Sequence, residues 1–120
     1  MTEEEYNQFC GNLPGTQFVR QWGDSAVWKV GGKVFAIAGW QVAPSTLAVT
    51  FKVSPLSFDI LKEQPGLRPA PYLASRGFQW IQHYADPGLS DDALKQYIEE
   101  SHRLVASGLS KKKQAELGLL

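Results

Sequence analysis

The sequence predicts an α+β fold, in which a mostly antiparallel sheet of about five strands carries N- and C-terminal helices on one face. Two observations indicate this class. The first and last thirds of the chain each hold a segment whose apolar residues recur at helical spacing. Between them lie short segments with alternating apolar and polar residues, bounded by Gly and Pro. The expected strands are 16–21, 26–30, 33–38, 47–53 and 78–84.

The first helix has a clear start and a clear stop. Thr2 followed three residues later by Glu5 is a capping box, and Pro14-Gly15 ends the helix. The face predicted to be buried consists of Tyr6, Phe9, Cys10 and Leu13. We therefore expect Cys10 to be a small core residue and not a nucleophile, because a buried thiol is inert without a nearby base or positive field.

A hairpin is predicted around Gly31-Gly32, a two-residue turn that tolerates positive φ. The implied register sets Trp28 opposite Phe35 and Ala26 opposite Ile37, so that these residues share one bulky face. The other, less bulky face carries Val27, Lys29, Val34, Ala36 and Ala38. Antiparallel sheets commonly bury only one side, so we expect the helices to cover the bulky one.

The second half begins with a short helix, predicted from Ser54 as N-cap and Pro55 as first helical residue. It ends before Pro65-Gly66, and a long connection over 66–77 follows. The strand over 78–84 is expected to be anchored in the core by Trp80.

Ser90 is expected to cap the last helix, with Asp91 and Asp92 suited to its positive end. Its buried stripe is predicted to be Leu94, Tyr97, Ile98, Ser101, Leu104 and Val105. His102 would then lie on the polar side. Gly108 would stop the helix before a short tail that starts with three lysines.

Length and composition fit a single domain over residues 1–120. The 43% of hydrophobic and 20% of charged residues are ordinary for a globular protein with one core. The single cysteine forbids an internal disulfide and is typical of a reducing compartment. The acidic start is no signal peptide, and no apolar run reaches about 18 residues. We therefore expect a cytoplasmic protein without membrane contact.

The net charge is zero, which argues against strong non-specific DNA binding. The charges are nevertheless uneven, because residues 16–85 hold seven Lys and Arg against three acids, and both flanking regions are acidic. The candidate cations for an anion site are Arg20, Lys29, Lys33, Lys52, Arg68 and Arg76. Strand alternation places Lys29 and Lys52 on the less bulky face. An ordinary solvated sheet face would show the same pattern.

Trp22 and Trp40 are expected in or beside loops. Aromatic side chains in such places can stack on unpaired bases, which stabilises a complex by about 1–3 kcal/mol each. An aromatic residue at a sheet edge can also simply cover the core, and the sequence leaves both interpretations open. Trp28 and Trp80 are expected in the core.

No catalytic or metal-binding constellation can be found in the sequence. His83 and His102 are the only histidines, and with Cys10 they do not supply about four converging ligands for zinc. A Gly-x-Ser-x-Gly motif and a Gly-rich phosphate loop are also absent. We therefore expect no metal, no cofactor and no enzyme activity.

One run in the second half is more specific than these patterns. It comprises Pro69-Ala70-Pro71-Tyr72-Leu73, Phe78-Gln79-Trp80-Ile81 and Ser101-His102-Arg103-Leu104-Val105. Weaker matches precede it in order, at Leu13-Pro14-Gly15, Val30–Ala36 and Leu47–Lys52. Together these segments resemble the MmcQ/YjbR family of small, mostly bacterial proteins. Trp22, where the family often has a proline, and Trp40 depart from its usual loop residues.

The resemblance implies a fold similar to CyaY, the bacterial frataxin, and a DNA-binding, regulatory role. In the double-wing-like arrangement that it suggests, the sheet and loops lie against the DNA and the cations pair with phosphates. We expect about three or four such contacts, hence weak binding, and a monomer or weak homodimer. The alternative is a protein-interaction or small-ligand-binding module without nucleic-acid activity. A contiguous basic patch beside Trp22 or Trp40 would favour DNA, and a concave apolar pocket the alternative.

Overall fold

The computed structural model describes residues 1–40, 47–73 and 78–120, and these form ten helices and strands. In chain order they are α1 (Glu3–Gly11), β1 (Thr16–Gln21), β2 (Ser25–Val30), β3 (Lys33–Ala38), β4 (Val49–Lys52), α2 (Pro55–Leu61), β5 (Leu67–Pro69), β6 (Trp80–His83), α3 (Asp91–Ser107) and α4 (Lys111–Glu116).

The helix starts confirm the capping signals of the sequence. The Thr2 hydroxyl accepts a hydrogen bond from the Glu5 amide, and the Glu5 carboxylate accepts one from the Thr2 amide. Ser54 caps α2, with Pro55 at its first position, and Ser90 caps α3. The chain therefore enters each of these helices where local side-chain chemistry satisfies the first free amides.

The described residues form one six-stranded antiparallel sheet in the order β1-β2-β3-β4-β6-β5. The α+β class and the mostly antiparallel sheet are confirmed, with one strand more than predicted. The additional strand is β5, which lies in the predicted long connection. It has only three residues and ends in Pro69, so it shows no alternation, and at the sheet edge its proline costs no ladder bond.

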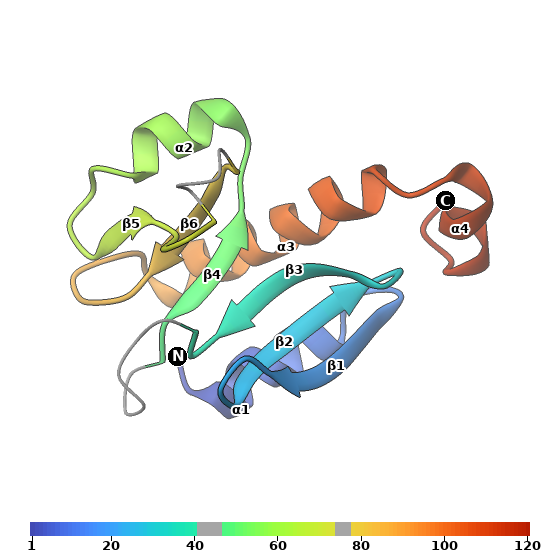
Figure 1. Cartoon of the computed structure of the whole chain (residues 1–120), viewed down its shortest axis with the longest axis horizontal. Coiled ribbons are helices and arrows are strands. Elements are labelled where there is room, and N and C mark those ends of the chain that lie inside the picture. The colour runs from blue at the N-terminus through green and yellow to red at the C-terminus, as the bar shows by residue number, and fades with distance from the viewer. Residues whose placement is uncertain (41–46, 74–77) are drawn as a thin grey trace.

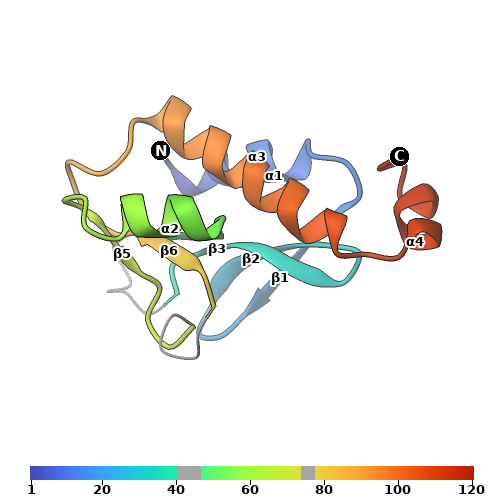
Figure 2. The same cartoon turned by 90° about the horizontal axis from the view of Figure 1, so that it is seen from above.

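The helices cover one face of the sheet, as predicted. Figure 1 shows α1 running beneath β1 and β2 and the long α3 crossing β3 and β4, and the edge-on view in Figure 2 places both helices on the same side. We call this side the helix face and the opposite side the outer face. The short α4 extends beyond the end of the sheet.

The core lies between the sheet and the two covering helices. Its fully buried aromatic side chains are Tyr6 from α1, Phe35 from β3 and Phe51 from β4. Each such side chain contributes about 1.5–3 kcal/mol through burial. The Tyr6 hydroxyl donates a hydrogen bond of 3.0 Å to the Ala26 carbonyl and so fixes α1 on β2. Trp28 is half-buried against this core and donates to Asn7 of α1.

A β-bulge in β3 changes the faces of the sheet. Lys29 pairs with Val34, but the preceding residue of β2, Trp28, pairs with Ala36, so that Phe35 is an extra residue on β3. Phe35 and Ala36 both belong to the helix-face core. Alternation then resumes with opposite phase, which turns Ile37 to the outer face beside Val34.

The predicted hairpin register is therefore wrong beyond Lys29. Ala26 lies opposite Ala38, not Ile37, and Trp28 lies opposite Ala36, not Phe35. Ala36 and Ala38 are in the core, although they were expected on the less bulky face. The Gly31-Gly32 turn fixes the pairing only up to the bulge, and the sequence carries no signal for the inserted residue.

Ser101 of α3 is bonded to the sheet beside the bulge. Its hydroxyl donates a 2.7 Å hydrogen bond to the Phe35 carbonyl and accepts a 2.8 Å bond from the Lys52 amide. A fully buried serine in a helix thus joins two neighbouring strands to α3.

The position of His102 also differs from the prediction. It was expected on the polar side of α3 but is buried, with its ring edge-on to Phe35 at a centroid distance of 5.2 Å. Its Nε2–H donates to the Pro14 carbonyl at 2.8 Å. The reason is that α3 packs against both the sheet and the turn after α1, so its buried stripe is wider than the predicted one.

Among the described helices, none combines the length and the apolar character that crossing a membrane requires.

Candidate functional site

The outer face carries an aromatic hollow. It encloses about 460 Å³ and is lined by Trp22, Val34, Ile37, Trp40, Tyr72, Leu73 and Trp80. Val34, Ile37 and Trp80 come from strands of the sheet and form its floor, whereas the other four come from the loops at the two ends of these strands. The hollow is therefore an open, largely apolar site on the side of the sheet that α1 and α3 leave uncovered.

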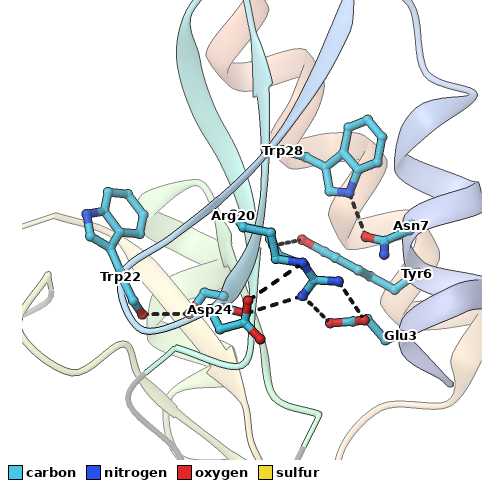
Figure 3. Close-up of polar contacts among 9 residues, drawn as sticks. Glu3, Tyr6, Asn7, Arg20, Trp22, Asp24 and Trp28 are labelled. Carbon is cyan, nitrogen blue, oxygen red and sulfur yellow. Dashed lines mark hydrogen bonds and ion pairs between the residues drawn. The ribbon is translucent and has the colours of Figure 1, made fainter.

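Trp22 forms part of its wall from the tight turn between β1 and β2. Its backbone adopts φ 53°, which is rare for a bulky residue, and the Ser25 hydroxyl donates to its carbonyl at 3.1 Å. The side chain is 49% exposed. Figure 3 shows it pointing away from α1, on the opposite side of the hairpin from Trp28. The turn thus holds an exposed indole over the outer face.

Trp40 packs beside Trp22 at one end of the hollow, with ring centroids 6.2 Å apart and planes inclined by 49°. Its carbonyl accepts a 2.6 Å hydrogen bond from the Gln82 side-chain amide. The Gln82 carbonyl oxygen in turn accepts from the Nε and Nη2 of Arg68, at 2.8 and 2.6 Å. Because Gln82 is fully buried, this chain of hydrogen bonds fixes one wall of the hollow to the sheet.

Two lysines flank the floor of the hollow. Lys29 pairs with Val34 across the hairpin, and Lys52 pairs with Trp80. Paired residues share a face, so both lysines lie on the outer face, as alternation predicts. Since β3 separates their strands, their backbones are about 10 Å apart. Within the described part of the chain, neither forms an ion pair.

The other candidate cations do not join this group. Arg20 lies on the helix face, where it forms a two-pronged salt bridge with Glu3 at 2.9 and 3.0 Å (Figure 3). That contact lowers the pKa of the Glu3 carboxyl and raises that of Arg20. Lys33 is exposed at the hairpin end of β3. Arg68 stacks on Tyr84 at 4.5 Å in addition to binding Gln82. Arg76 lies outside the described residues.

Several residues of the hollow were missed by sequence reasoning. Trp80 was expected in the core but is half-buried on the outer face, because it pairs with the outward-facing Lys52. Ile37 was assigned to the wrong face because of the bulge. Tyr72 and Leu73 lie in the family-like run of the second half, but nothing in their spacing indicates that they fold back over the sheet.

Other reactive groups are not arranged as sites. Burial raises the pKa of the Cys10 thiol well above its usual range, and the thiol lies beside Tyr6 in the core. In segments 1–40, 47–73 and 78–120, no three His, Cys, Asp or Glu side chains converge as metal ligands would.

These features define a small α+β protein with helices on one face of an antiparallel sheet and an aromatic hollow on the other. The chain belongs to the YjbR family, whose model matches residues 11–104. α4 and the C-terminal end of α3 lie beyond the matched region.

Solved structures show the same fold. A Deinococcus radiodurans protein with a DUF419 domain superposes with a TM-score of 0.82 at 23% identity, covering 99% of this chain and 89% of its own. A Pseudomonas syringae protein gives a TM-score of 0.68 at 20% identity, covering 88% of this chain and 99% of its own. No curated protein matches the sequence significantly. At these identities the likeness concerns the fold alone.

Proposed function

We propose that the protein binds unpaired nucleic acid on the outer face of its sheet, as a binding protein without catalytic activity. A base would enter the aromatic hollow, and Lys29 and Lys52 would pair with the adjoining phosphates. The observation that carries this proposal is the juxtaposition of three tryptophans with two lysines on one uncovered sheet face.

The hollow supplies the chemistry for a base. Trp22 and Trp40 present indole rings from the two loops at one end of the sheet, and Trp80 of β6 forms part of the floor. Stacking on an aromatic side chain stabilises a bound base by about 1–3 kcal/mol and tolerates any sequence, since every base has a π-face. Bases inside a duplex are already stacked and cannot enter such a hollow. The geometry therefore supports unpaired strands over the duplex contact that the family resemblance suggests.

The charge distribution favours approach from the same side. Both covering helices begin with acidic residues, Glu3 to Glu5 in α1 and Asp91 and Asp92 in α3. An approaching polyanion is repelled from the helix face and meets Lys29 and Lys52 on the outer face. Two phosphate contacts on a single strand correspond to a salt slope of about −1.4 on a log–log plot.

A second candidate function is the binding of a small ligand without nucleic acid. The apolar floor favours it, because Val34 and Ile37 offer nothing to a phosphate, while Arg68 is engaged by Gln82 and Tyr84. Small-ligand sites are typically concave and mostly apolar, with few polar groups.

Fluorescence anisotropy with end-labelled single- and double-stranded oligonucleotides tests the proposal, at salt concentrations between about 50 and 200 mM. We expect micromolar binding of the single strand with a slope of about −1.4, and weaker binding of the duplex. The double variant Lys29→Glu/Lys52→Glu should abolish binding. Trp40→Ala should weaken it about tenfold.

The matched control is Lys111→Glu/Lys112→Glu, which makes the same charge change on the exposed surface of α4, away from the hollow. It should bind like the wild type. Equal losses in both double variants would indicate a non-specific effect of net charge. No binding of any oligonucleotide at the lowest salt would overturn the proposal in favour of the small-ligand candidate.

A further inference from the structure

Two aromatic residues of the hollow, Trp22 and Tyr72, have a backbone conformation that aromatic residues rarely adopt. Their φ angles are 53° and 70°, in the left-handed region. In the described part of the chain, Asp24 is the third non-glycine residue with positive φ. Aspartate tolerates this region because its short side chain can bond locally, but a bulky side chain there is a genuine outlier. At positions 22 and 72, glycine would therefore be the less strained residue.

Both strained residues also expose their rings at the same hollow. Trp22 is 49% and Tyr72 59% exposed, and both line the hollow. Trp40 and Trp80, the other two aromatic residues that line it, are less exposed. A ring that stays about half in water gains only part of the stabilisation that full burial provides. Coverage of the core alone therefore does not explain why the strain is retained.

Trp22 and Tyr72 approach the hollow from opposite ends of the sheet. Trp22 lies in the turn between β1 and β2. The antiparallel register places the ends of β3 and β6 at the same end of the sheet as this turn. Tyr72 follows β5, whose last residue lies beside the start of β6 at the other end. The floor formed by Val34 and Ile37 lies between, so a bound molecule is open to contact from both ends.

We propose that Trp22 and Tyr72 form an aromatic clamp that holds one base of an unpaired strand from both ends of the hollow, and that their strained backbone is retained for this contact. The inference rests on the proposed function, since it requires a base in the hollow. Strained backbone is concentrated at binding sites and ligand clamps, where the surrounding structure maintains it. Two aromatic side chains on one ligand select a planar ring, which can stack or pack edge-on against each of them.

Stability separates strain that is retained for binding from ordinary coverage of the core. Trp22→Gly and Tyr72→Gly each remove the ring and the strain together, so their urea midpoints should equal or exceed that of the wild type. Trp22→Ala and Tyr72→Ala remove the ring but keep the strain, and should have lower midpoints than the glycine variants. Glycine variants that are less stable than the wild type would show that the rings serve the fold, and would overturn the inference.

Phe18→Ala is the matched control for an aromatic residue that covers the core. Phe18 is 42% exposed and packs against Trp28 on the helix face, with ring centroids 5.2 Å apart. Its loss should lower the urea midpoint, because a packed aromatic contact disappears. Its affinity for oligonucleotides should stay at the wild-type value, since the residue lies on the face opposite the hollow.

Affinity should move in the opposite direction to stability in the clamp variants. Anisotropy titrations with a short, end-labelled single strand should show about tenfold weaker binding for each glycine variant, the effect of one lost stacking contact. Tyr72→Phe keeps the ring and should bind like the wild type. Unchanged affinity in the glycine variants would overturn the inference, and so would a loss in Tyr72→Phe equal to that in Tyr72→Gly.

The double variant Trp22→Gly/Tyr72→Gly tests whether the two rings contact one base. Rings that hold the same base depend on each other, so the combined loss should stay well below the product of the single losses, about a hundredfold. Losses that multiply would mean that the rings contact separate parts of the strand, and would overturn the clamp. A wild type that binds no strand at low salt defeats the proposed function itself, whereas wild-type binding with unaffected variants defeats the clamp alone.

Discussion

The side-chain amide of Gln82 donates a 2.6 Å hydrogen bond to the backbone carbonyl of Trp40, 42 residues earlier in the chain. Through this bond a buried strand residue determines where an aromatic wall of the hollow stands. Gln82 also accepts two hydrogen bonds from Arg68, so one side chain joins β6, β5 and the loop after β3. Loop residues at binding sites need such support, because a loop alone does not hold a side chain in place.

Gln82→Leu should therefore affect both stability and binding. It leaves the Trp40 carbonyl without its buried donor, which costs about 1–3 kcal/mol of unfolding free energy. The released wall should also weaken oligonucleotide binding. Urea denaturation and anisotropy measure the two effects. Gln96→Leu makes the same change on the exposed surface of α3 and should alter the unfolding free energy by less than about 0.5 kcal/mol. Equal effects of the two variants would contradict a specific role for Gln82.

Ser101→Ala should be among the more damaging single-atom changes in the protein. It removes the hydroxyl that bonds both the Phe35 carbonyl and the Lys52 amide in the core. We expect a loss of about 2–3 kcal/mol in unfolding free energy, because two buried polar groups lose a partner. Ser107→Ala is the control in α3, since the exposed Ser107 hydroxyl donates only to the Leu104 carbonyl one turn earlier and does not contact the sheet. This control should be neutral or slightly stabilising, as alanine favours helix. A neutral Ser101→Ala would show that water replaces the hydroxyl.

Gly66 and Gly32 form a matched pair for separating backbone strain from steric conflict. Both have φ near the left-handed region, at +87° and +83°. A Cβ at Gly32 would meet nothing within 4 Å, whereas one at Gly66 would collide with the Ala85 carbonyl and lie 2.6 Å from the Gly88 amide. We expect Gly32→Ala to cost about 1–2 kcal/mol and Gly66→Ala at least about 2 kcal/mol more, measured by urea denaturation. Similar costs would mean that the 83–89 loop moves aside easily.

His83 should make the protein less stable in mild acid. Burial lowers its pKa from the usual 6.5, against the opposing effects of the Leu89 backbone and Asp86, while the amino terminus adds to the lowering. The folded state thus binds fewer protons than the unfolded state, so this contribution to stability is full above about pH 6.5 and declines below it. His83→Gln removes the titration. Between about pH 7.5 and 5, the urea midpoint of the wild type should fall further than that of this variant. Equal falls in the two proteins would refute the prediction.

Features that depend on neighbouring residues could be predicted from the sequence, whereas features that depend on contacts between distant segments could not. Thr2, Ser54 and Ser90 cap the helices that they predict, because a cap depends on residues three positions away. The bounds 16–21 and 33–38 agree with β1 and β3, because the glycines and prolines that delimit strands are also local signals. The bulge at Phe35 lies where β3 contacts Ser101 and His102 of α3, more than 60 residues away in the chain, and no local pattern in the sequence indicates it.

For the site, the same distinction holds. Lys29 and Lys52 were placed on the outer face because each lies in a strand with regular alternation. Trp22 and Trp40 were expected in loops, but their approach to within 6.2 Å is a tertiary contact. Arg20 was grouped with the sheet cations, yet it faces the helices and binds Glu3, because alternation in β1 turns it to the same side as Phe18. Trp80 looked like a core residue because large apolar groups usually are.

The placement of the tryptophans has a practical consequence for spectroscopy. Three of the four indoles in the chain line the hollow, and the fourth, Trp28, lies on the helix face with its Nε1–H bonded to Asn7. Any ring that enters the hollow changes the surroundings of three emitters at once and leaves one as a constant background. Intrinsic emission of the unlabelled protein thus reports occupancy, and a Trp28→Phe variant would report it almost free of background.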